Sequence, residues 1–429
     1  MYRYLHIKID VIRIFELLVY FKLESHFDKV TSECQQGGMK QGDTIENLAM
    51  LSSIIVDRED QGKGLLMTAV DAVKCFDRVH WSDSHAVLQT SGGDKKALKM
   101  LYKMSVTNRL RVAGGRQITI MNGDGQGSIS AARKTTYMID ECTVRHSKMI
   151  PREIWVIHRN EPVNNKGFVD DELLLAESRA ASAIGSKLYS RTMNELAMSA
   201  HPTKSVAGAQ EWVEKMKDEL KEAPCSMQGF DLKVSESEKY LGMFFVSGSY
   251  SASLDMNIEH KCKKMMIAAN GIRVICNIPG VRRVGKLQAQ RLLIMAQISP
   301  ICLYGMQAWM RVTDAQYSKL EAGFKKAILT VLSVPKCTNY EALLRQINNI
   351  HIRQFSDAIK LKCWNSKLWV KARGKIVRVL QYEIGMGIKT GLAGEFEATC
   401  QKYEIPNICL FPANPNQIDF HVKRFSYNL

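Results

Sequence analysis

Two adjacent carboxylates, Asp170 and Asp171, constrain this chain more than any other feature of its sequence. They lie between two apolar segments, residues 167–169 and residues 173–176. This pattern predicts a strand, a tight acidic turn and a second strand. Two ionised carboxylates side by side repel each other, and a fold that presents them at a hairpin tip usually holds a divalent cation between them. A solvated acidic loop is the commoner explanation for such a pair taken alone.

A third carboxylate, Asp71, ends an apolar stretch over residues 65–71 that predicts a strand. Two-metal nucleotidyl transfer needs carboxylates that converge from separate strands, so that two cations roughly 3.5–4 Å apart bind the attacking and leaving oxygens. Asp71, Asp170 and Asp171 meet that requirement. As an isolated residue, Asp71 would also suit the cap of a helix that runs from Val73 toward Trp81.

The order and spacing of five motifs resemble the palm of a reverse transcriptase of the non-LTR, LINE-like retrotransposon type. The motifs are residues 71–77, 123–128, 168–171, 201–205 and 239–242. For the first motif, the resemblance implies that Asp71 binds metal and that Phe76 excludes a ribose 2′-hydroxyl. In the third motif, Phe168 stands where the family usually carries Tyr or Phe.

The second and fourth motifs imply contacts with the nucleotide. The second is a loop ahead of a helix that would support the template base and the incoming nucleotide, with Gly125, Gln126 and Gly127 at its centre. In the fourth, the resemblance places Lys204 near the triphosphate as a proton donor to the leaving pyrophosphate. Without the resemblance, Gln126 suits an ordinary turn and Lys204 suits solvated surface.

The fifth motif resembles the hairpin that grips the primer end. It consists of Lys239, Tyr240, Leu241 and Gly242. Tyr240 in an apolar strand could equally be a core aromatic with a satisfied hydroxyl group. The motif therefore leaves a structural and a functional role open for this side chain.

The resemblance implies an RNA-directed DNA polymerase that uses two Mg²⁺ ions, for which Mn²⁺ is a substitute. Asp71 and Asp170 would bind both cations, and Asp171 would be a weaker or indirect ligand. Oxygen-only ligands suit magnesium. The bulk of Phe76 favours deoxynucleotides and disfavours an RNA-directed RNA polymerase with the same palm, although core packing also explains this ring. The implied partners are an RNA template, a DNA primer or target end, and dNTPs.

The implied fold is α+β, a right-hand polymerase with an antiparallel palm sheet. Residues 1–64 are expected to form partial, mostly helical fingers, residues 65–248 the palm, residues 249–335 a helical thumb, and residues 336–429 a helical C-terminal extension. Residues 35–44, which begin with Gln35, resemble the family's fingers segment. Residues 300–309 resemble the helix after the thumb, so that the resemblance covers roughly residues 30–380.

Several departures from the family pattern favour an element copy that has lost its flanks. The fingers look truncated before Gln35, no endonuclease domain precedes the palm, and no Cys/His cluster with zinc spacing follows it. A decayed or repurposed copy that binds nucleic acid without extending a primer is the alternative function. The six intact residues of the motifs favour the active enzyme: Asp71, Phe76, Gln126, Asp170, Asp171 and Lys204.

Hydrophobic periodicity predicts the remaining elements. We expect an amphipathic helix over residues 1–21 and a helix over 45–57. Within the palm we expect a largely helical segment 81–104, a hairpin 110–120, a helix 129–146, the acidic hairpin 154–176 and a helix 180–198. Beyond residue 251, helices are expected over 258–272, 286–298 and 316–332.

Composition agrees with a polyanionic partner. Fifty-nine Lys and Arg residues against forty-three Asp and Glu give a net charge of +16, and such a surplus favours phosphate-rich ligands. The eleven cysteines include no C-x-x-C pair, which indicates a reducing, intracellular compartment. Charges interrupt the apolar N-terminus, so we expect a soluble chain without a membrane segment. No signal distinguishes nucleus from cytoplasm, and no motif for a protein partner is visible.

Overall fold

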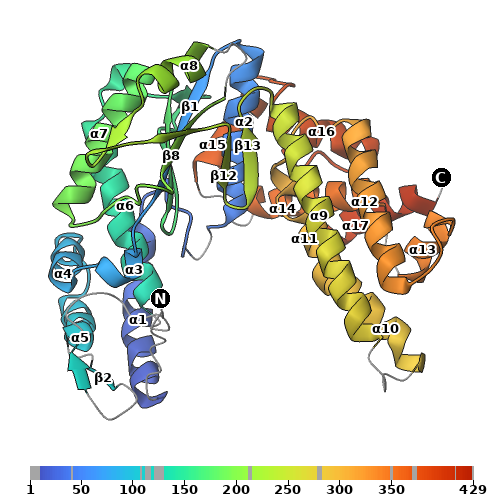
Figure 1. Cartoon of the computed structure of the whole chain (residues 1–429), viewed down its shortest axis with the longest axis horizontal. Helices are drawn as coiled ribbons and strands as arrows, with labels where there is room; N and C mark the ends of the chain where they lie inside the picture. The colour runs from blue at the N-terminus through green and yellow to red at the C-terminus, as the bar shows by residue number, and fades with distance from the viewer. Residues whose placement is uncertain are drawn as a thin grey trace. The chain divides into compact units, whose positions relative to one another are not determined.

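The computed structural model divides into two compact units, each built from segments that are discontinuous in sequence (Figure 1). The first comprises Met1–Asn47 and Gly62–Leu241, and the second comprises Leu48–Gln61 and Gly242–Leu429. The structure describes residues 10–39, 42–106, 109–111, 117–119, 130–210, 215–277, 283–347, 351–369, 374–410 and 412–427. The class is α+β, as the sequence predicted, with a small and mainly antiparallel sheet and many helices.

A five-stranded sheet with the strand order β11-β8-β1-β7-β6 belongs to the first unit. Its strands are β1 (Leu65–Asp71), β6 (Asn165–Phe168), β7 (Asp171–Ala176), β8 (Val206–Gln210) and β11 (Lys233–Ser235). The central strand β1 pairs antiparallel with β7 and β8, β6 pairs antiparallel with β7, and β11 pairs parallel with β8. The near-continuous apolar run of β1 suits its surroundings, because successive side chains of Leu65–Thr68, which point to opposite faces of the sheet, are all buried.

Two long helices, α6 (Ala131–Met149) and α7 (Arg179–Glu195), pack against each other and on this sheet. The first contacts β6, and the second contacts β7 and β1. Helix α7 begins after Ser178, whose hydroxyl accepts a hydrogen bond from the Ala181 amide at 3.1 Å, as an N-cap residue does. The core of the unit lies between sheet and helices and includes Leu66, Leu174, Tyr189 and Met193.

The segment predicted as one helix over residues 81–104 forms two helices, α4 (Trp81–Thr90) and α5 (Lys95–Val106). The break has a local cause. The Asp94 carboxylate accepts hydrogen bonds from the amides of Lys96 and Ala97 at 2.8 and 3.0 Å, so it starts a new helix. The predicted hairpin after these helices is present as β2 (Arg109–Arg111) paired with β3 (Gln117–Thr119).

The N-terminal helix α1 is described over Asp10–Val30 and ends later than predicted, and residues 1–9 lie outside the described ranges. Glu16 is one of the charges that interrupt the apolar residues of this helix. The structure buries Glu16, and its Oε1 accepts hydrogen bonds from the Ser130 hydroxyl at 2.7 Å and the Ser130 amide at 3.2 Å. A buried carboxylate of this kind is retained because it is hydrogen-bonded, which charge spacing alone does not reveal.

Shorter elements complete the first unit. They are α3 (Cys75–Arg78), η1 (Arg152–Ile154), β4 (Ile157–His158), β5 (Glu161–Pro162), α8 (Lys215–Glu222), β9 (Ser226–Met227), β10 (Phe230–Asp231) and β12 (Ser237–Tyr240). Helix α2 (Thr44–Asp60), which the sequence predicted over 45–57, begins in the first unit and continues into the second.

The second unit is almost entirely helical. Its elements are β13 (Met243–Val246), α9 (Tyr250–Cys276), α10 (Arg283–Leu293), η2 (Ile294–Ile298), α11 (Ser299–Leu303), η3 (Met306–Ala308), α12 (Asp314–Leu332), α13 (Tyr340–Gln346), α14 (Ile352–Trp369), α15 (Lys375–Gly385), α16 (Leu392–Lys402) and α17 (Pro415–Tyr427). Helices α9 and α12 pack along each other (Figure 1). The three helices predicted after residue 251 fall within α9, the α10–η2 segment and α12.

The core of the second unit contains the largest fully buried side chains of its helices, among them Trp309, Phe324, Trp364 and Phe396. The side chain of Lys360 is buried in this core. Its ammonium donates to the Trp309 carbonyl at 2.7 Å and pairs with the Glu395 carboxylate at 3.1 Å. A buried cation needs such partners, because an unpaired charge away from water is very costly.

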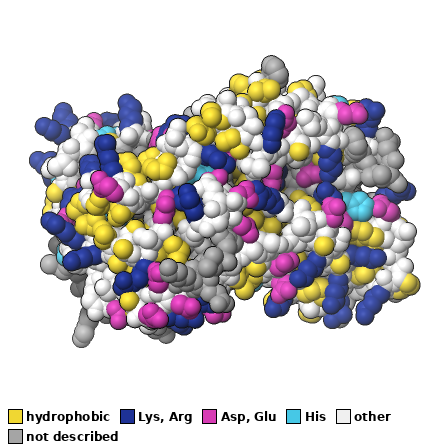
Figure 2. Space-filling view, turned by 90° about the horizontal axis from the view of Figure 1, so that it is seen from above, with side chains coloured by type: hydrophobic (Ala, Val, Ile, Leu, Met, Phe, Trp, Pro, Cys, Tyr) yellow, Lys and Arg dark blue, Asp and Glu magenta, His cyan; other side chains and the backbone are white. Residues whose placement is uncertain are grey.

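The surface carries the basic surplus of the sequence without a single large basic patch on the face seen in Figure 2. Lys and Arg side chains are spread over this face, and Asp and Glu side chains lie between many of them. None of the helices in the described ranges combines the length and the apolar character that crossing a bilayer needs. All eleven cysteines are free thiols.

Candidate active site

Two of the three predicted metal ligands end up opposite each other in the sheet of the first unit. Asp71 is the last residue of β1, Asp171 is the first residue of β7, and the two are Cα partners in the antiparallel register. Directly opposed residues carry their side chains on the same face, with Cβ atoms about 4.5–5.5 Å apart. Asp170 is the next residue back, in the turn between β6 and β7. Three carboxylates thus converge at one end of the central strand.

The neighbouring negative charges affect the pKa of Asp171. Desolvation of its carboxyl group raises that pKa, and the negative charges of Asp170 and Asp71 raise it further, whereas Lys204 and Lys239 act in the opposite direction. An acid whose charge is disfavoured by its neighbours gains from a nearby cation. A cation bound near Asp171 would offset this repulsion, so cation binding stays a prediction for these carboxylates.

The backbone of residues 199–205 brings Lys204 to Asp71. The Val73 amide donates to the Ser199 carbonyl at 2.8 Å, and the His201 amide donates to the Asp71 carbonyl at 2.7 Å. These bonds dock the segment along the end of β1. The Lys204 ammonium lies 3.4 Å from Asp71 Oδ2 and 3.5 Å from Oδ1. Because both side chains are partly exposed, this ion pair contributes little to stability, which leaves the ammonium available to other anions.

The donor set fits magnesium by its chemistry. Asp71, Asp170 and Asp171 offer carboxylate oxygens alone, which hard cations prefer. Within the described ranges, no group of three or more His, Cys, Asp or Glu side chains, these three carboxylates included, is arranged so that it could hold a metal ion. Magnesium commonly keeps several waters and is bound through one or two carboxylates together with substrate phosphates. An open carboxylate group is consistent with that mode of binding.

The turn that carries Asp170 has an unusual backbone. Phe168 and Asp171 are paired, so that Val169 and Asp170 form a two-residue turn, and Val169 has φ of +59°. A β-branched residue at positive φ is a genuine outlier, and such outliers concentrate at functional sites. The side-chain amide of Gln35 is hydrogen-bonded to Val169 in this turn, at 2.9 Å from the Val169 backbone nitrogen and 3.2 Å from its carbonyl oxygen. The sequence pointed to Gln35 only as part of a fingers segment, and no periodic pattern could reveal this long-range contact.

Phe76 lies on the short helix α3, directly after β1. The preceding Cys75 is buried, as expected for a small core residue, whereas Phe76 is only partly buried. A partly exposed ring close to Asp71 in the chain can contact a ligand, which a fully packed core ring cannot. Gly125, Gln126 and Gly127 lie outside the described residues, so their role stays a prediction.

The primer motif divides into a buried and an exposed part. The Tyr240 hydroxyl is buried, donates to the Lys166 carbonyl at 3.1 Å and accepts from the Asn47 side-chain amide at 3.1 Å. This is the core role that the sequence left open for the tyrosine. Lys239 is exposed, and Leu241 and Gly242 have positive φ of 46° and 81°, as a tight two-residue turn requires. At this turn the chain passes from the first unit to the second.

Glu238 precedes this motif in the sequence, and its burial makes the free energy of unfolding depend on pH. Burial raises its pKa to about 7, although a hydrogen bond with Ser235 counteracts the shift, and its Oε1 has no hydrogen-bond partner. Between pH 4.5 and 7 the folded state retains a proton that the unfolded state releases, so stability falls as pH rises through this window. We expect Glu238→Gln to raise the free energy of unfolding by about 1–3 kcal/mol at pH 8 and hardly at all at pH 4.5.

Urea unfolding at the two pH values measures this difference. The matched control is Glu236→Gln, which removes an exposed carboxylate that lies 2.8 Å from the Lys217 ammonium. The pKa of Glu236 is lowered by that lysine, so the control should show no gain in stability at pH 8. An equal gain in both variants would contradict the burial of Glu238.

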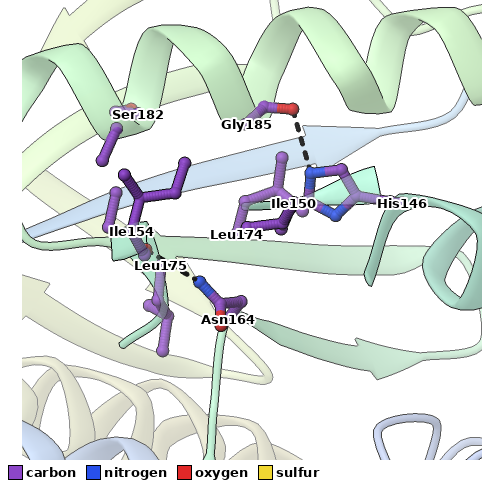
Figure 3. A pocket seen from close by; sticks show the side chains of 10 residues that line it. His146, Ile150, Ile154, Asn164, Leu174, Leu175, Ser182 and Gly185 are labelled. Carbon is purple, nitrogen blue, oxygen red and sulfur yellow. Dashed lines mark hydrogen bonds between the residues drawn. The ribbon is translucent and has the colours of Figure 1, made fainter. Parts of the chain in front are cut away.

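A small, mainly apolar cavity lies elsewhere in the first unit, between α6, α7 and the β7 strand (Figure 3). His146 lines it and is hydrogen-bonded at both ring nitrogens, since its Nε2 lies 3.0 Å from the Gly185 carbonyl oxygen and its Nδ1 lies 3.0 Å from the Asn165 side-chain nitrogen. Burial lowers the pKa of His146 to about 4. None of the predicted site residues lines this cavity, which is therefore a packing feature of the core.

Comparison with known proteins finds only distant structural likeness. No protein-family model matches this sequence, and no curated protein is significantly similar to it. Among solved structures, the chain is similar to telomerase from Candida albicans in complex with a TWJ fragment of telomeric RNA, at 11% identity and a TM-score of 0.40 over 80% of this chain and 57% of that chain. It is also similar to apo telomerase from Candida tropicalis, at 9% identity and a TM-score of 0.41 over 96% of this chain and 60% of that chain.

The chain thus spans less than two thirds of the length of these telomerase chains. A second Candida tropicalis structure, in complex with the TWJ fragment, matches with a TM-score of 0.38 at 9% identity. Identities and TM-scores of this size carry no activity from one protein to the other.

Proposed function

We propose that this chain is an RNA-directed DNA polymerase of the non-LTR retrotransposon type, which transfers a deoxynucleotide to a primer 3′-hydroxyl. The observation that carries the proposal is the register of the central strands, which sets Asp71 opposite Asp171, with the Lys204 ammonium 3.4 Å from Asp71. Three sequence motifs separated by long stretches of chain supply these residues. Their meeting at one end of an antiparallel sheet is the arrangement that the palm of such an enzyme requires.

The carboxylates and the lysine take separate roles in this reaction. Asp71 and Asp170 would hold two Mg²⁺ ions, with Asp171 as the weaker ligand. When bound, the cations would lower the pKa of the primer 3′-hydroxyl and neutralise charge on the triphosphate and the leaving pyrophosphate. Lys204 is exposed, so its ammonium can turn from Asp71 to the phosphates and donate a proton to the leaving pyrophosphate. In-line transfer then depends mainly on positioning and electrostatics.

The nucleic-acid partners follow from charge as well as from the site. The net charge of +16 favours a polyanion, and the exposed residues of helix α9 include Lys263, Lys264 and Arg273. We propose an RNA template and a DNA primer or target end as ligands, in the palm, thumb and partial fingers of a right-hand polymerase. Affinity should decrease steeply with salt, because each neutralised phosphate releases counterions.

The decisive experiment is primer extension on an RNA template, with dNTPs in one reaction and NTPs in a second, in the presence of Mg²⁺. We expect extension with dNTPs and little with NTPs. Binding to the template–primer duplex without extension would identify a chain that keeps the nucleic-acid surface and has lost catalysis. Extension with NTPs alone would identify an RNA polymerase, and the absence of both binding and extension would refute the proposal.

Sugar selectivity offers a separate test of Phe76. We expect Phe76→Val to raise ribonucleotide incorporation relative to deoxynucleotide incorporation by at least about tenfold, because the smaller side chain leaves room for a 2′-hydroxyl. Single-nucleotide incorporation with dCTP and CTP opposite template guanosine measures the ratio. The control is Phe230→Val, a partly buried phenylalanine on β10 of the same unit. An unchanged ratio in Phe76→Val would assign the ring to core packing.

A further inference from the structure

We propose that Gln35 is a positioning residue for the catalytic turn: its side-chain amide holds Val169 in a left-handed conformation and thereby sets the direction of the Asp170 and Asp171 carboxylates. This inference rests on the proposed polymerase function for its catalytic consequence. The contact itself is observed in the structure and does not depend on that function. It gives a structural role to the Gln-Gly segment, residues 35–38, for which the sequence motifs suggest none.

The turn needs external support because its first residue is unsuited to it. Val169 has φ of +59°, and a tight hairpin turn with positive φ at its first position usually carries glycine there. The β-branched side chain makes this conformation costly, and a strained residue persists only where its surroundings hold it in place. A turn left to relax would redirect the next two residues, which are both carboxylate ligands.

The Gln35 amide supplies that support through both of its polar atoms. Its Oε1 accepts from the Val169 amide at 2.9 Å, and its Nε2 donates to the Val169 carbonyl at 3.2 Å. A second bond to Oε1 comes from the Gly37 amide at 2.9 Å, which fixes the rotamer from the other side. Because Oε1 accepts from two N–H groups, the orientation of the amide is determined by its partners.

The segment that carries Gln35 is itself tied to the hairpin. The Gly167 amide donates to the Cys34 carbonyl at 2.9 Å, and the Gln36 amide donates to the Gly167 carbonyl at 3.0 Å. Gln35 is only 1% exposed, so water does not compete for its hydrogen bonds. Hydrogen bonds of the neighbouring backbone therefore fix the position of the Gln35 side-chain amide, as a precise site requires of a supporting residue.

The matched pair of variants is Gln35→Met and Gln36→Met. Both replace an amide with an apolar chain of similar length, but the Gln36 side chain donates to the Glu33 carbonyl and does not contact the turn. Val169→Gly, alone and combined with Gln35→Met, relieves the strain directly, because glycine adopts positive φ at no steric cost. The readouts are single-nucleotide incorporation, the Mg²⁺ concentration at half-maximal rate, and amide hydrogen exchange of residues 168–172.

We expect Gln35→Met to lower the incorporation rate at least about tenfold, to raise the Mg²⁺ requirement and to accelerate exchange in the turn, because a small misplacement of reacting groups is costly. Gln36→Met should stay within about twofold of the wild type, since its contact lies away from the carboxylates. In the Gln35→Met background, Val169→Gly should recover part of the lost rate, which a general loss of stability would not allow. Equal effects of the two methionine variants, or purely additive effects in the double variant, would overturn the proposal.

The exchange measurement separates this inference from the proposed function. If the wild-type chain incorporates no nucleotide, the polymerase assignment fails, and the turn is judged by exchange alone. Faster exchange of residues 168–172 in Gln35→Met than in Gln36→Met then supports the positioning role of Gln35. Identical exchange in the two variants overturns it, whatever the activity.

Discussion

Asp170→Asn is expected to lower single-nucleotide incorporation by about 100- to 1,000-fold while the Kd for a template–primer duplex changes by less than about threefold. In the proposed function the carboxylate would hold the cations of the reaction, whereas affinity for the duplex would come from the many basic side chains. Asparagine keeps the size of the side chain and its tendency to occupy turns, so the hairpin should fold. Rapid-quench incorporation and duplex titration measure the two quantities on the same preparation. Asp71→Asn should give the same pattern, because Asp71 faces Asp171 across the sheet.

The control for this prediction is Asp231→Asn, which changes an exposed acid on β10 of the same unit. It should leave incorporation and binding at wild-type values. Persistent incorporation by both Asp170→Asn and Asp71→Asn would remove the metal assignment. A parallel loss of binding in these variants would show instead that the carboxylates maintain the fold.

Gly37→Ala is expected to abolish activity and to destabilise the first unit. A Cβ at this position would lie 2.1 Å from the Val169 amide nitrogen and 2.7 Å from the Phe168 carbonyl carbon. Both atoms belong to backbone, which cannot move aside without displacing the hairpin. We expect the free energy of unfolding to fall by about 2–4 kcal/mol and incorporation to fall at least about 100-fold. Urea unfolding and single-nucleotide incorporation test the two parts.

Gly271→Ala on helix α9 is the matched control, because a Cβ there meets no atom within 4 Å. Alanine is the better helix former, so this variant should be unchanged or more stable by about 0.5–1 kcal/mol. If Gly37→Ala unfolded at the same urea concentration as the wild type, the Gln-Gly segment would not lie against the acidic turn in solution.

Local signals predicted the parts of the site that depend on neighbouring residues. The strand over residues 65–71 has the predicted bounds, because a seven-residue, largely apolar run that follows Gly62 and Gly64 has the length and flanks of a strand. The acidic hairpin was predicted over residues 154–176 but forms only over the second half of that range, as β6 and β7, while β4 and β5 form a separate short hairpin. The α+β class was implied by the resemblance, and the mixed helices and mainly antiparallel sheet agree with it.

Long-range partners could not be predicted in this way. The spacing of Glu16 in an amphipathic helix does not reveal its partner, and only the fold shows that it accepts hydrogen bonds from Ser130. The Gln35 contact with Val169 depends on which segments the sheet brings together, and no helical or strand periodicity encodes it. The division of residues 81–104 into two helices was accessible, since Gly92, Gly93 and Asp94 are a break signal that hydrophobic periodicity outweighed.

The candidate site brings together residues that are far apart in the sequence and are therefore synthesised at different times. Lys204 and Asp71 are separated by 133 residues, and Gln35 and Val169 by 134. Contacts across such separations carry a large loop-closure entropy and slow the folding of sheets that depend on them. A nascent chain that has emerged only to residue 200 already carries all three carboxylates, but it lacks β8, one of the two neighbours of β1. The sheet that sets Asp71 opposite Asp171 is therefore complete only when β8 and β11 have followed, although the carboxylates themselves are present earlier.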